Sequence, residues 1–541
     1  MATIERRVAS DPPADSTRSP VSPGEQTAEP SVLGRGVALP ELTEEPRCFK
    51  DLNLDQAVNQ IVARFDEYDL EPLFYTPLPS SREVAYRQEV MRDAERAEFA
   101  QAIDQFAKSM RQVRSFVRLV GKLSFQRQRE AWYLEAIGTY CHAVQDLARF
   151  LLGAKAESRG LRAIGEYFAN YVGSEEFIAL ARETEDLKRD LGEIRYAMTI
   201  KDASVRVSAY EDEEDYGAAV ENTFQRFAQG AVEDHRARYA TLQEMGHVEA
   251  AVLEFVAKLY PAAFDELAAY CARHEEFCDR VVLRFDREIQ FFVAYHAYTQ
   301  PIKAAGLGFC YPRVSDSKDV GATSTFDLPL SHKLAGEGTS VVTNDWRLDG
   351  AERIFVVSGP NQGGKTTFAR TFGQLHYLAA IGCPVPGRET RLFLFDRLFT
   401  HFEREEDIRN LSGKLENDLL RIYRILEGAT PNSILIMNES FLSTTLTDAL
   451  FLSKRILERV IELDMLCVSV TFLDELSSFS RTTVSMVSTV DPQDPARRTF
   501  KVVRKPADGL AYAVAIAEKY HLTYSGVRSR VAGNARERKA S

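Results

Sequence analysis

The sequence lacks the features that mark membrane and secreted proteins. None of its apolar stretches approaches the roughly 18 consecutive residues that a membrane-spanning helix requires, and its first residues lack the apolar core of a signal peptide. Its seven cysteines are scattered without a Cys-x-x-Cys pair, which argues against a disulfide framework and is typical of reduced thiols. We therefore expect a cytoplasmic protein with no membrane segment.

Positive charge is also in short supply. The 541 residues include 79 acidic and 67 basic side chains, which gives a formal net charge of −12. A generally basic surface is excluded, so any contact with nucleic acid must come from local patches or from an enclosing shape. The function classes that depend on a strongly basic fold are therefore disfavoured, but DNA binding is not.

One local basic patch lies in the segment "KSMRQVRSFVRLVGKLSFQRQR". At 100° per residue, five basic side chains of this segment fall within about a third of a helical wheel, and apolar residues fill the opposite side. The five are Lys108, Arg111, Arg114, Arg118 and Lys122. Such a stripe is typical of an ordinary solvated helix face, and it is also what a phosphate-facing DNA contact requires. The sequence leaves both interpretations open.

The length predicts at least two domains, because single cores stop growing at roughly 250 to 300 residues. Residues 1–45 are rich in Pro, Ser, Thr and charge, so we expect a disordered N-terminal segment. Apolar residues at three-to-four spacing predict a helical domain over 46–335, with a small β-hairpin in "EIRYAMTIKDASVRVSAY". We expect an α/β domain over 336–525 and a basic flexible tail over 526–541.

Three short apolar runs follow the change in composition near residue 336. "RIFVV", "SILIM" and "LCVSVTF" read as buried strands, and segments of helical length separate them. Buried strands that alternate with helices predict a largely parallel sheet. The expected fold is therefore multi-domain, with a largely α-helical N-terminal domain followed by an α/β P-loop NTPase domain.

The strongest motif is "VVSGPNQGGKTTFART", which reads G-x-x-x-x-G-K-T from Gly359 to Thr366 behind an apolar run. A strand, a glycine-rich loop and a helix in this order cradle phosphate, because backbone N–H groups turn inward and the helix N-terminus favours negative charge. Lys365 should reach the β- and γ-phosphates of ATP, and the Thr366 hydroxyl should bind Mg²⁺. The predicted nucleotide-binding residues are Gly359, Pro360, Asn361, Gly363, Gly364, Lys365, Thr366 and Thr367.

A second strand, "SILIMNES", ends in Asn438 and Glu439. Glu439 is the predicted catalytic residue, because a carboxylate at this point can orient or deprotonate the attacking water. We predict that Thr366, Asn438 and Glu439 form the magnesium site. Asn438 occupies the position where an aspartate would usually bind the water molecules around the magnesium ion. An amide carries no charge, so the affinity for magnesium should be reduced.

These motifs together resemble the nucleotide-binding domain of the MutS family of DNA-repair ATPases. The resemblance is carried by "GPNQGGKTTFARTFGQLHYLAAIGCPVPG", "DRLFTHF", "NESFLSTTLTDALFLS", "TFLDELSSF" and "FKVVRKPADGLAYAVAIAEKYHL". It is strong over about residues 340–525 and looser over about 50–340, where the helical region resembles the core and lever of the family. The resemblance implies an ABC-type ATPase fold, ATP and Mg²⁺ as cofactors, DNA as a partner, and a dimer whose sites are completed across two subunits.

The chain departs from the family pattern at several positions. Where the family has a signature serine that completes the ATP site of the partner subunit, the best register places Gly413 with Ser412 beside it. Phe472 stands where the family has a histidine, and there is no room before residue 50 for a mismatch-reading domain. Together with Asn438, these changes imply slow hydrolysis, or ATP binding used alone as the switch.

Three functions fit the sequence. The first is a MutS-like ATPase that binds duplex or branched DNA as a nucleotide-switched homodimeric clamp, in repair or recombination rather than in direct mismatch reading. The second is a nucleotide-gated scaffold that contacts a protein partner and has little affinity for DNA. The third, a transporter-type ATPase, is disfavoured by the attached helical domain. The adenine contacts are expected from "VVTNDWRL", with Val341 or Trp346 beside the base.

Overall fold

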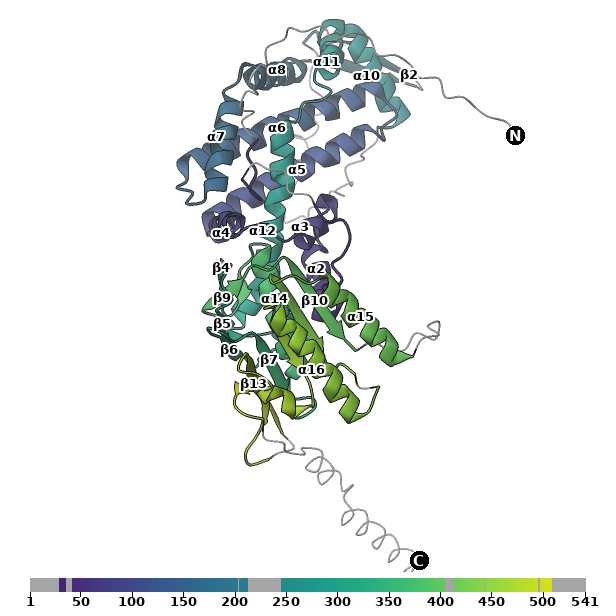
Figure 1. Ribbon diagram of the computed structural model, residues 1–541. Coiled ribbons are helices and arrows are strands. Elements are labelled where there is room, and N and C mark those ends of the chain that lie inside the picture. The colour runs from purple at the N-terminus through teal and green to yellow at the C-terminus, as the bar shows by residue number, and fades with distance from the viewer. Residues whose placement is uncertain are drawn as a thin grey trace, which may run out of the picture.

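The protein consists of a helical part and an α/β part, which are joined along the helix α12 (Arg280–Ala304) (Figure 1). The computed structural model describes residues 29–35, 41–202, 204–212, 245–403, 413–441, 443–494 and 497–507. In Figure 1 the helical part lies above and the α/β part below. Among the helices of these ranges, none is long and apolar enough to cross a membrane.

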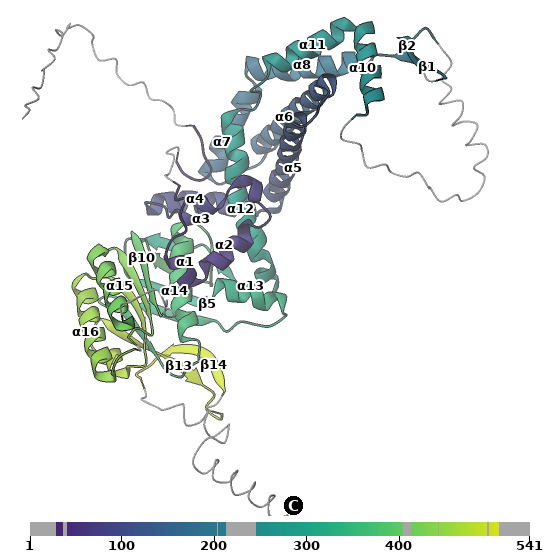
Figure 2. The ribbon, with the colours of Figure 1, turned by 90° about the vertical axis from the view of Figure 1, so that its right-hand side faces the viewer.

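Two long helices, α5 (Ala97–Val120) and α6 (Gln126–Gly153), run side by side away from the α/β part (Figure 2). They form because apolar residues recur on one face: Phe99, Ile103 and Phe106 of α5 are all buried. The remaining helices of this part are α4 (Ser81–Glu95), α7 (Arg159–Val172), α8 (Glu175–Gly192), α10 (His247–Leu259) and α11 (Pro261–Arg273).

The predicted β-hairpin is confirmed, and it lies at the far end of the helical part. Strands β1 (Tyr196–Lys201) and β2 (Ser204–Ala209) pair antiparallel, with Lys201 opposite Ser204 at the turn. One face of the hairpin carries Met198 and Ile200, which stay exposed. The local alternation of the sequence was sufficient to place this element.

Within the described residues, six strands form the central sheet of the α/β part, in the order β10-β11-β12-β7-β13-β14. The first five are parallel and β14 is antiparallel to β13. Their bounds are β7 (Ile354–Ser358), β10 (Arg397–Phe402), β11 (Ser433–Asn438), β12 (Leu466–Val470), β13 (Thr483–Val490) and β14 (Arg498–Arg504). The expected largely parallel sheet is therefore present.

Helices cover both faces of this sheet. The helix α14 (Lys365–Ala380) packs on one face, and α15 (Lys414–Gly428) and α16 (Leu446–Glu462) lie on the other (Figure 2). A short 3-10 helix, η2 (Asp474–Ser478), follows β12. Because the strands are parallel, the loops after β7, β11 and β12 all lie at the same edge of the sheet.

The predicted domain boundary at residue 335/336 is wrong for the strands that precede it. A four-stranded sheet in the order β4-β9-β5-β6 combines strands from both sides of that boundary, and β3 pairs with β8 across it. These elements are β3 (Phe309–Cys310), β4 (Arg313–Ser315), β5 (Val320–Thr325), α13 (Leu328–Gly336), β6 (Asn344–Leu348), β8 (Val385–Pro386) and β9 (Thr390–Phe393). Pairing between distant strands is not visible in local composition.

The N-terminal helix α1 (Cys48–Leu52) packs on β10 and α14 of the α/β part. It is followed by α2 (Leu54–Val62), the 3-10 helix η1 (Asp66–Tyr68) and α3 (Glu71–Tyr75). On α14, Arg370 Nε donates to the carbonyl of Asp51 and Gln374 Nε2 donates to the carbonyl of Leu52. The α/β part is therefore assembled from two separate stretches of the chain.

The expected disorder of residues 1–45 does not hold for residues 29–35. Val32 is fully buried, and a Glu288 carboxylate oxygen accepts hydrogen bonds from the Ser31 hydroxyl and the Val32 amide. Arg87 Nε donates to the carbonyl of Leu33. A short apolar pair with buried polar partners thus fixes a segment whose overall composition is typical of disorder. Residues 1–28 and 36–40 lie outside the described residues.

Candidate functional site

The glycine-rich loop follows β7 directly and leads into α14, which begins at Lys365. Gly359 has a φ of 112° and Gly364 a φ of 92°, so both need the left-handed region that glycine tolerates best. A Cβ atom on Gly359 would lie 2.7 Å from the carbonyl oxygen of Ser488 on β13. The loop is therefore closed against the neighbouring strand, with the N-terminus of α14 at its end.

Lys365 is held inside this loop. Its side chain is only 5% exposed, and Nζ donates to the carbonyls of Gly359 (3.0 Å) and Pro360 (3.2 Å) and to Asn361 Oδ1 (3.1 Å). Burial lowers the pKa of Lys365 below that of an ordinary lysine, and the Glu439 carboxylate 3.9 Å away opposes this shift. The ammonium is thus a buried, preoriented cation at the sheet edge, which is what an anionic ligand requires.

Thr366, Asn438 and Glu439 meet beside Lys365. The Thr366 hydroxyl donates to Asn438 Oδ1 at 2.8 Å, and Glu439 follows directly with a φ of 51°. The Glu439 amide donates to the carbonyl of Val470 at the end of β12. The structure therefore brings the three residues of the predicted magnesium site together.

The oxygen donors of Thr366, Asn438 and Glu439 fit a metal ion that is held mainly by a bound phosphorylated ligand. In the described ranges, no group of three or more His, Cys, Asp or Glu side chains gathers as a metal site. One hydroxyl, one amide oxygen and one carboxylate are hard oxygen donors of the kind that Mg²⁺ prefers, but they supply a single charge. Such a site depends on the phosphate oxygens of a nucleotide to hold the ion.

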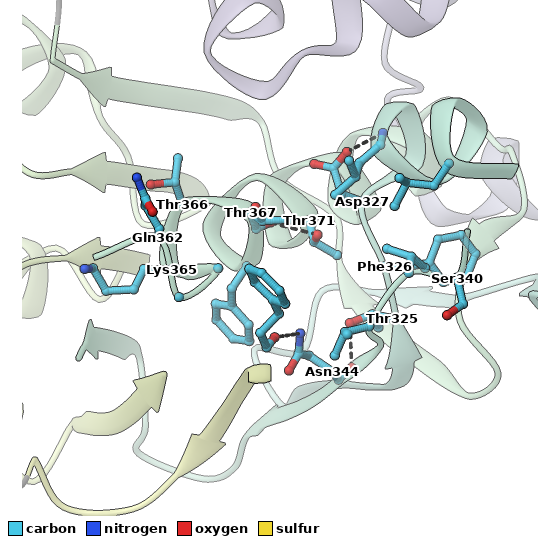
Figure 3. A pocket seen from close by; sticks show the side chains of 18 of the residues that line it. Thr325, Phe326, Asp327, Ser340, Asn344, Gln362, Lys365, Thr366, Thr367 and Thr371 are labelled. Carbon is cyan, nitrogen blue, oxygen red and sulfur yellow. Dashed lines mark hydrogen bonds between the residues drawn. The ribbon is translucent and has the colours of Figure 1, made fainter. Parts of the chain in front are cut away.

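A cavity of about 680 Å³ opens from the loop toward α13 (Figure 3). Figure 3 shows Lys365 and Thr366 at one end and Phe326 and Ser340 at the other. The apolar lining comes from α13, α14, β14 and the segments before α13 and β6, and it consists of Phe326, Leu330, Leu334, Val341, Val342, Phe368 and Phe500. A polar end and an apolar end in one cavity suit a phosphorylated ligand with a flat, weakly polar group.

The two residues considered for the base lie in different places. Val341 lines the cavity. Trp346 is 5% exposed and packs against Phe355, Phe372 and His376 in the core, so it does not offer a stacking face. Its predicted role at the base is wrong, because β6 turns this side chain inward.

The comparisons with known proteins agree with this geometry. Residues 355–531 match the family model described as MutS domain V. They cover β7, the loop, α14 and the strand that ends at Asn438. Residues 355–531 are therefore a domain of the MutS family.

The curated relatives match through this same region. The DNA mismatch repair protein MutS of Caldicellulosiruptor bescii is 32% identical over 133 residues, which are 24% of this chain and 15% of the relative. MutS of Shouchella clausii is 31% identical over 155 residues (29% and 18%), and MutS of Erythrobacter litoralis is 28% identical over 185 residues (34% and 21%). The matched stretch thus spans about a fifth or less of these relatives.

Of the two candidate trans residues of this MutS domain, only Gly413 lies within the described residues. Gly413 is the residue before α15 and is exposed, whereas Ser412 lies outside the described residues. Phe472 follows β12, is 47% exposed, and is not among the residues that line the cavity. Gly413 and Phe472 both reach solvent, as contacts with a second molecule would need.

Several basic side chains of the predicted stripe on α5 form ion pairs within the protein. Both Arg111 and Arg114 bind the carboxylate of Glu67, and Arg114 also binds the buried carboxylate of Asp286. Lys108 pairs with Asp104 one turn away, at the exposed surface. Arg118 and Lys122 are exposed at the end of the helix. Arg114 therefore fastens α5 to α12, and the stripe is not the uniform cationic surface that the helical wheel suggested.

Sequence reasoning missed two residues of this MutS domain, one at the cavity and one at the turn that carries Glu439. Phe500 on β14 has a φ of 58°, is 49% exposed, and lines the cavity. His401 on β10 is 1% exposed and contacts Ser440, the residue after Glu439. The polar His401 inside the apolar run "LFTHF" is a weak signal, whereas Phe500 in "RTFKVV" gives none, because aromatic residues are common in strands.

Proposed function

We propose that this chain binds ATP with Mg²⁺ in the Gly359–Thr366 loop and acts as an ABC-type, nucleotide-switched protein of DNA repair or recombination. The carrying observation is the buried Lys365 ammonium, with the Thr366–Asn438 pair and the Glu439 carboxylate beside it. A buried cation among backbone carbonyls at a helix N-terminus favours a phosphate ligand. The relatives named above are DNA mismatch repair proteins, which supports the assignment.

Each residue has a distinct task in this proposal. Lys365 exchanges its three loop acceptors for phosphate oxygens and neutralises their charge. Thr366 and Asn438 orient the magnesium ion, which supplies further charge neutralisation when bound. Glu439 accepts the proton of the attacking water. Because Asn438 carries no charge, we expect slow turnover.

The base end of the cavity is assigned to Phe500 and Val341. Phe500 presents a half-exposed ring to the cavity, and Val341 lies on the segment that leads into β6. A flat base stacks on an aromatic ring, and an aliphatic side chain contacts its other face. Phe500 replaces Trp346 as the stacking residue, because Trp346 is buried in the core against Phe372.

The proposed assembly is a homodimer that clamps duplex or branched DNA. The exposed Gly413 at the start of α15 and the exposed Phe472 lie where a second subunit can reach the nucleotide site. The candidates for phosphate contact that remain are Lys108 and Arg118 on α5 and Lys122 just after it. The second candidate function, a nucleotide-gated scaffold for a protein partner, is favoured by the acidic net charge of −12 and by the ion pairs that occupy Arg111 and Arg114.

Two measurements test the proposal. Sedimentation velocity with and without ATP and Mg²⁺ is expected to show a dimer that strengthens with nucleotide, because ligands that bind across subunits stabilise the assembly. A monomer under every nucleotide condition would rule out the dimeric clamp. Gel shifts with duplex and branched DNA at two salt concentrations, with and without ATP, are expected to show steeply salt-dependent binding. Nucleotide binding without any DNA affinity would favour the scaffold.

A further inference from the structure

We propose that His401 is a positioning residue that holds the Glu439 turn and links it to helix α15. This inference rests on the proposed nucleotide function and adds a route by which the surface at α15 regulates the site. The network consists of Ser440, His401 and Asp418, which come from three different elements.

The turn after β11 needs an external support. Glu439 has a φ of 51° and Phe441 a φ of 66°, and a bulky residue in the left-handed region is rare. Ser440 lies between them, and its hydroxyl is 3.0 Å from His401 Nδ1. Because β10 and β11 are parallel neighbours with His401 opposite Met437, the imidazole is placed by the sheet itself. By holding Ser440, His401 sets the direction in which the Glu439 side chain points.

The other side of the imidazole faces α15. His401 Nε2 lies 3.7 Å from Asp418 Oδ1, and both side chains are buried, at 1% and 8% exposure. Asp418 is in the first turns of α15, which begins after the exposed Gly413. A displacement of α15 by a second subunit therefore moves Asp418 and, through His401, the turn that carries Glu439. Strained turns at catalytic positions are suited to such control.

The residue types Ser, His and Asp also occur together in hydrolases, but accessibility excludes that role. His401 is 1% exposed, so its imidazole is enclosed in the fold and cannot exchange a proton with a substrate and its leaving group, although Ser440 itself is partly exposed. The pair acts within the fold, on the position of Glu439.

Two substitutions of His401 separate its two contacts. In His401→Asn the amide nitrogen takes the place of Nδ1, which retains the Ser440 contact and removes the Asp418 contact. In His401→Gln the amide reaches the place of Nε2, which retains the Asp418 contact and removes the Ser440 contact. Ser440→Ala removes the same contact from the other side. The matched control is Thr400→Val, which removes the hydrogen bond from Thr400 Oγ1 to Asp51 on the same strand, away from the turn.

The test uses the full chain and three readouts. Single-turnover ATP hydrolysis is expected to slow about tenfold in His401→Gln and Ser440→Ala, since a misplacement of about 1 Å costs up to ~100-fold. The affinity for ATP should stay unchanged, and the double variant should be no slower than either single one. His401→Asn should keep the rate but lose the change in hydrogen exchange of α15 on addition of ATP and Mg²⁺. In the nucleotide-free protein, the Glu439 and Phe441 amides should exchange faster in His401→Gln than in the wild type or Thr400→Val.

Wild-type exchange at Glu439 and Phe441 in both His401→Gln and Ser440→Ala would overturn the proposal. An unchanged response of α15 in His401→Asn would overturn the link to Asp418. A wild-type protein that binds no ATP would instead remove the proposed function. The exchange of the nucleotide-free turn would still decide the role of His401.

Discussion

The hydroxyl of Thr366 donates a 2.8 Å hydrogen bond to the side-chain oxygen of Asn438, across the edge of the central sheet. This bond joins the start of α14 to the end of β11, and it orients the amide oxygen toward the place that a magnesium ion would take. An amide accepts the hydroxyl proton as a carboxylate would, but it contributes no negative charge. In the proposed magnesium site, Asn438 therefore supplies an oxygen donor without a charge.

Asn438→Asp is expected to raise the affinity for Mg²⁺ in the presence of ATP several-fold and to increase the rate of ATP hydrolysis. The carboxylate restores a charge beside the ion while the hydrogen bond to Thr366 is retained. Magnesium titrations of the turnover rate measure both effects. Asn432→Asp, at an exposed position before the same strand, serves as the control for the added charge. Turnover and magnesium dependence at wild-type levels would show that ATP binding alone is the switch.

Lys365→Ala is expected to abolish ATP binding, with the affinity falling at least 100-fold, because each hydrogen bond from an ammonium to phosphate is worth about 1.5–3 kcal/mol. Because Lys365 is buried, the variant should also unfold at a slightly lower temperature. Equilibrium titration with a fluorescent ATP analogue measures the affinity, and far-UV circular dichroism verifies the fold. Lys258→Ala, on the distant helix α10, should bind ATP normally. Retained affinity in Lys365→Ala would refute the phosphate-binding role of the loop.

Arg118→Ala combined with Lys122→Ala is expected to weaken DNA binding and to reduce the slope of log affinity against log salt by about 2, since each phosphate contact contributes roughly 0.9. Both side chains are exposed at the end of α5. The control is Arg149→Ala on α6, which removes an exposed arginine that pairs with Asp146. Gel shifts over a salt series provide the slope. An unchanged slope would assign the basic face of α5 to the solvated surface.

The pH dependence of stability should report on Asp286. Burial raises the pKa of Asp286 to about 6, although the Arg114 guanidinium opposes the shift. The folded state therefore holds this proton more tightly than the unfolded state, whose pKa is near 3.8. The associated stability is fully present below the unfolded pKa and is lost as the pH rises through about 6, which amounts to about 3 kcal/mol.

Asp286→Asn should remove this pH-dependent contribution to the free energy of unfolding. The stability of the variant should therefore fall less between pH 4 and pH 7 than that of the wild type. Urea unfolding followed by the fluorescence of Trp132 reports on the helical part, because this ring packs against Phe116 of α5. Trp346→Phe silences the other of the two tryptophans in both proteins. Equal pH dependence with and without the Asp286 carboxyl group would contradict the raised pKa.

The sequence by itself determined the parts of the site that are contiguous in the chain. The loop from Gly359 to Thr366 needs only a strand, glycines and a helix N-terminus, all of which are local, and they occur together as predicted. The pair Asn438 and Glu439 was placed by the end of a buried apolar run, and the hairpin by strict alternation. Local periodicity and turn chemistry are sufficient for such elements.

Only the tertiary structure decided which distant residues meet. Trp346 lies in the core and Phe500 lines the cavity because strand register, which no local pattern encodes, turns one ring inward and the other outward. Arg114 became a structural ion pair because η1 and α12 bring Glu67 and Asp286 to it, which a helical wheel of α5 alone cannot show. The His401–Ser440 contact exists because β10 and β11 are neighbours in the sheet while lying more than thirty residues apart in the chain.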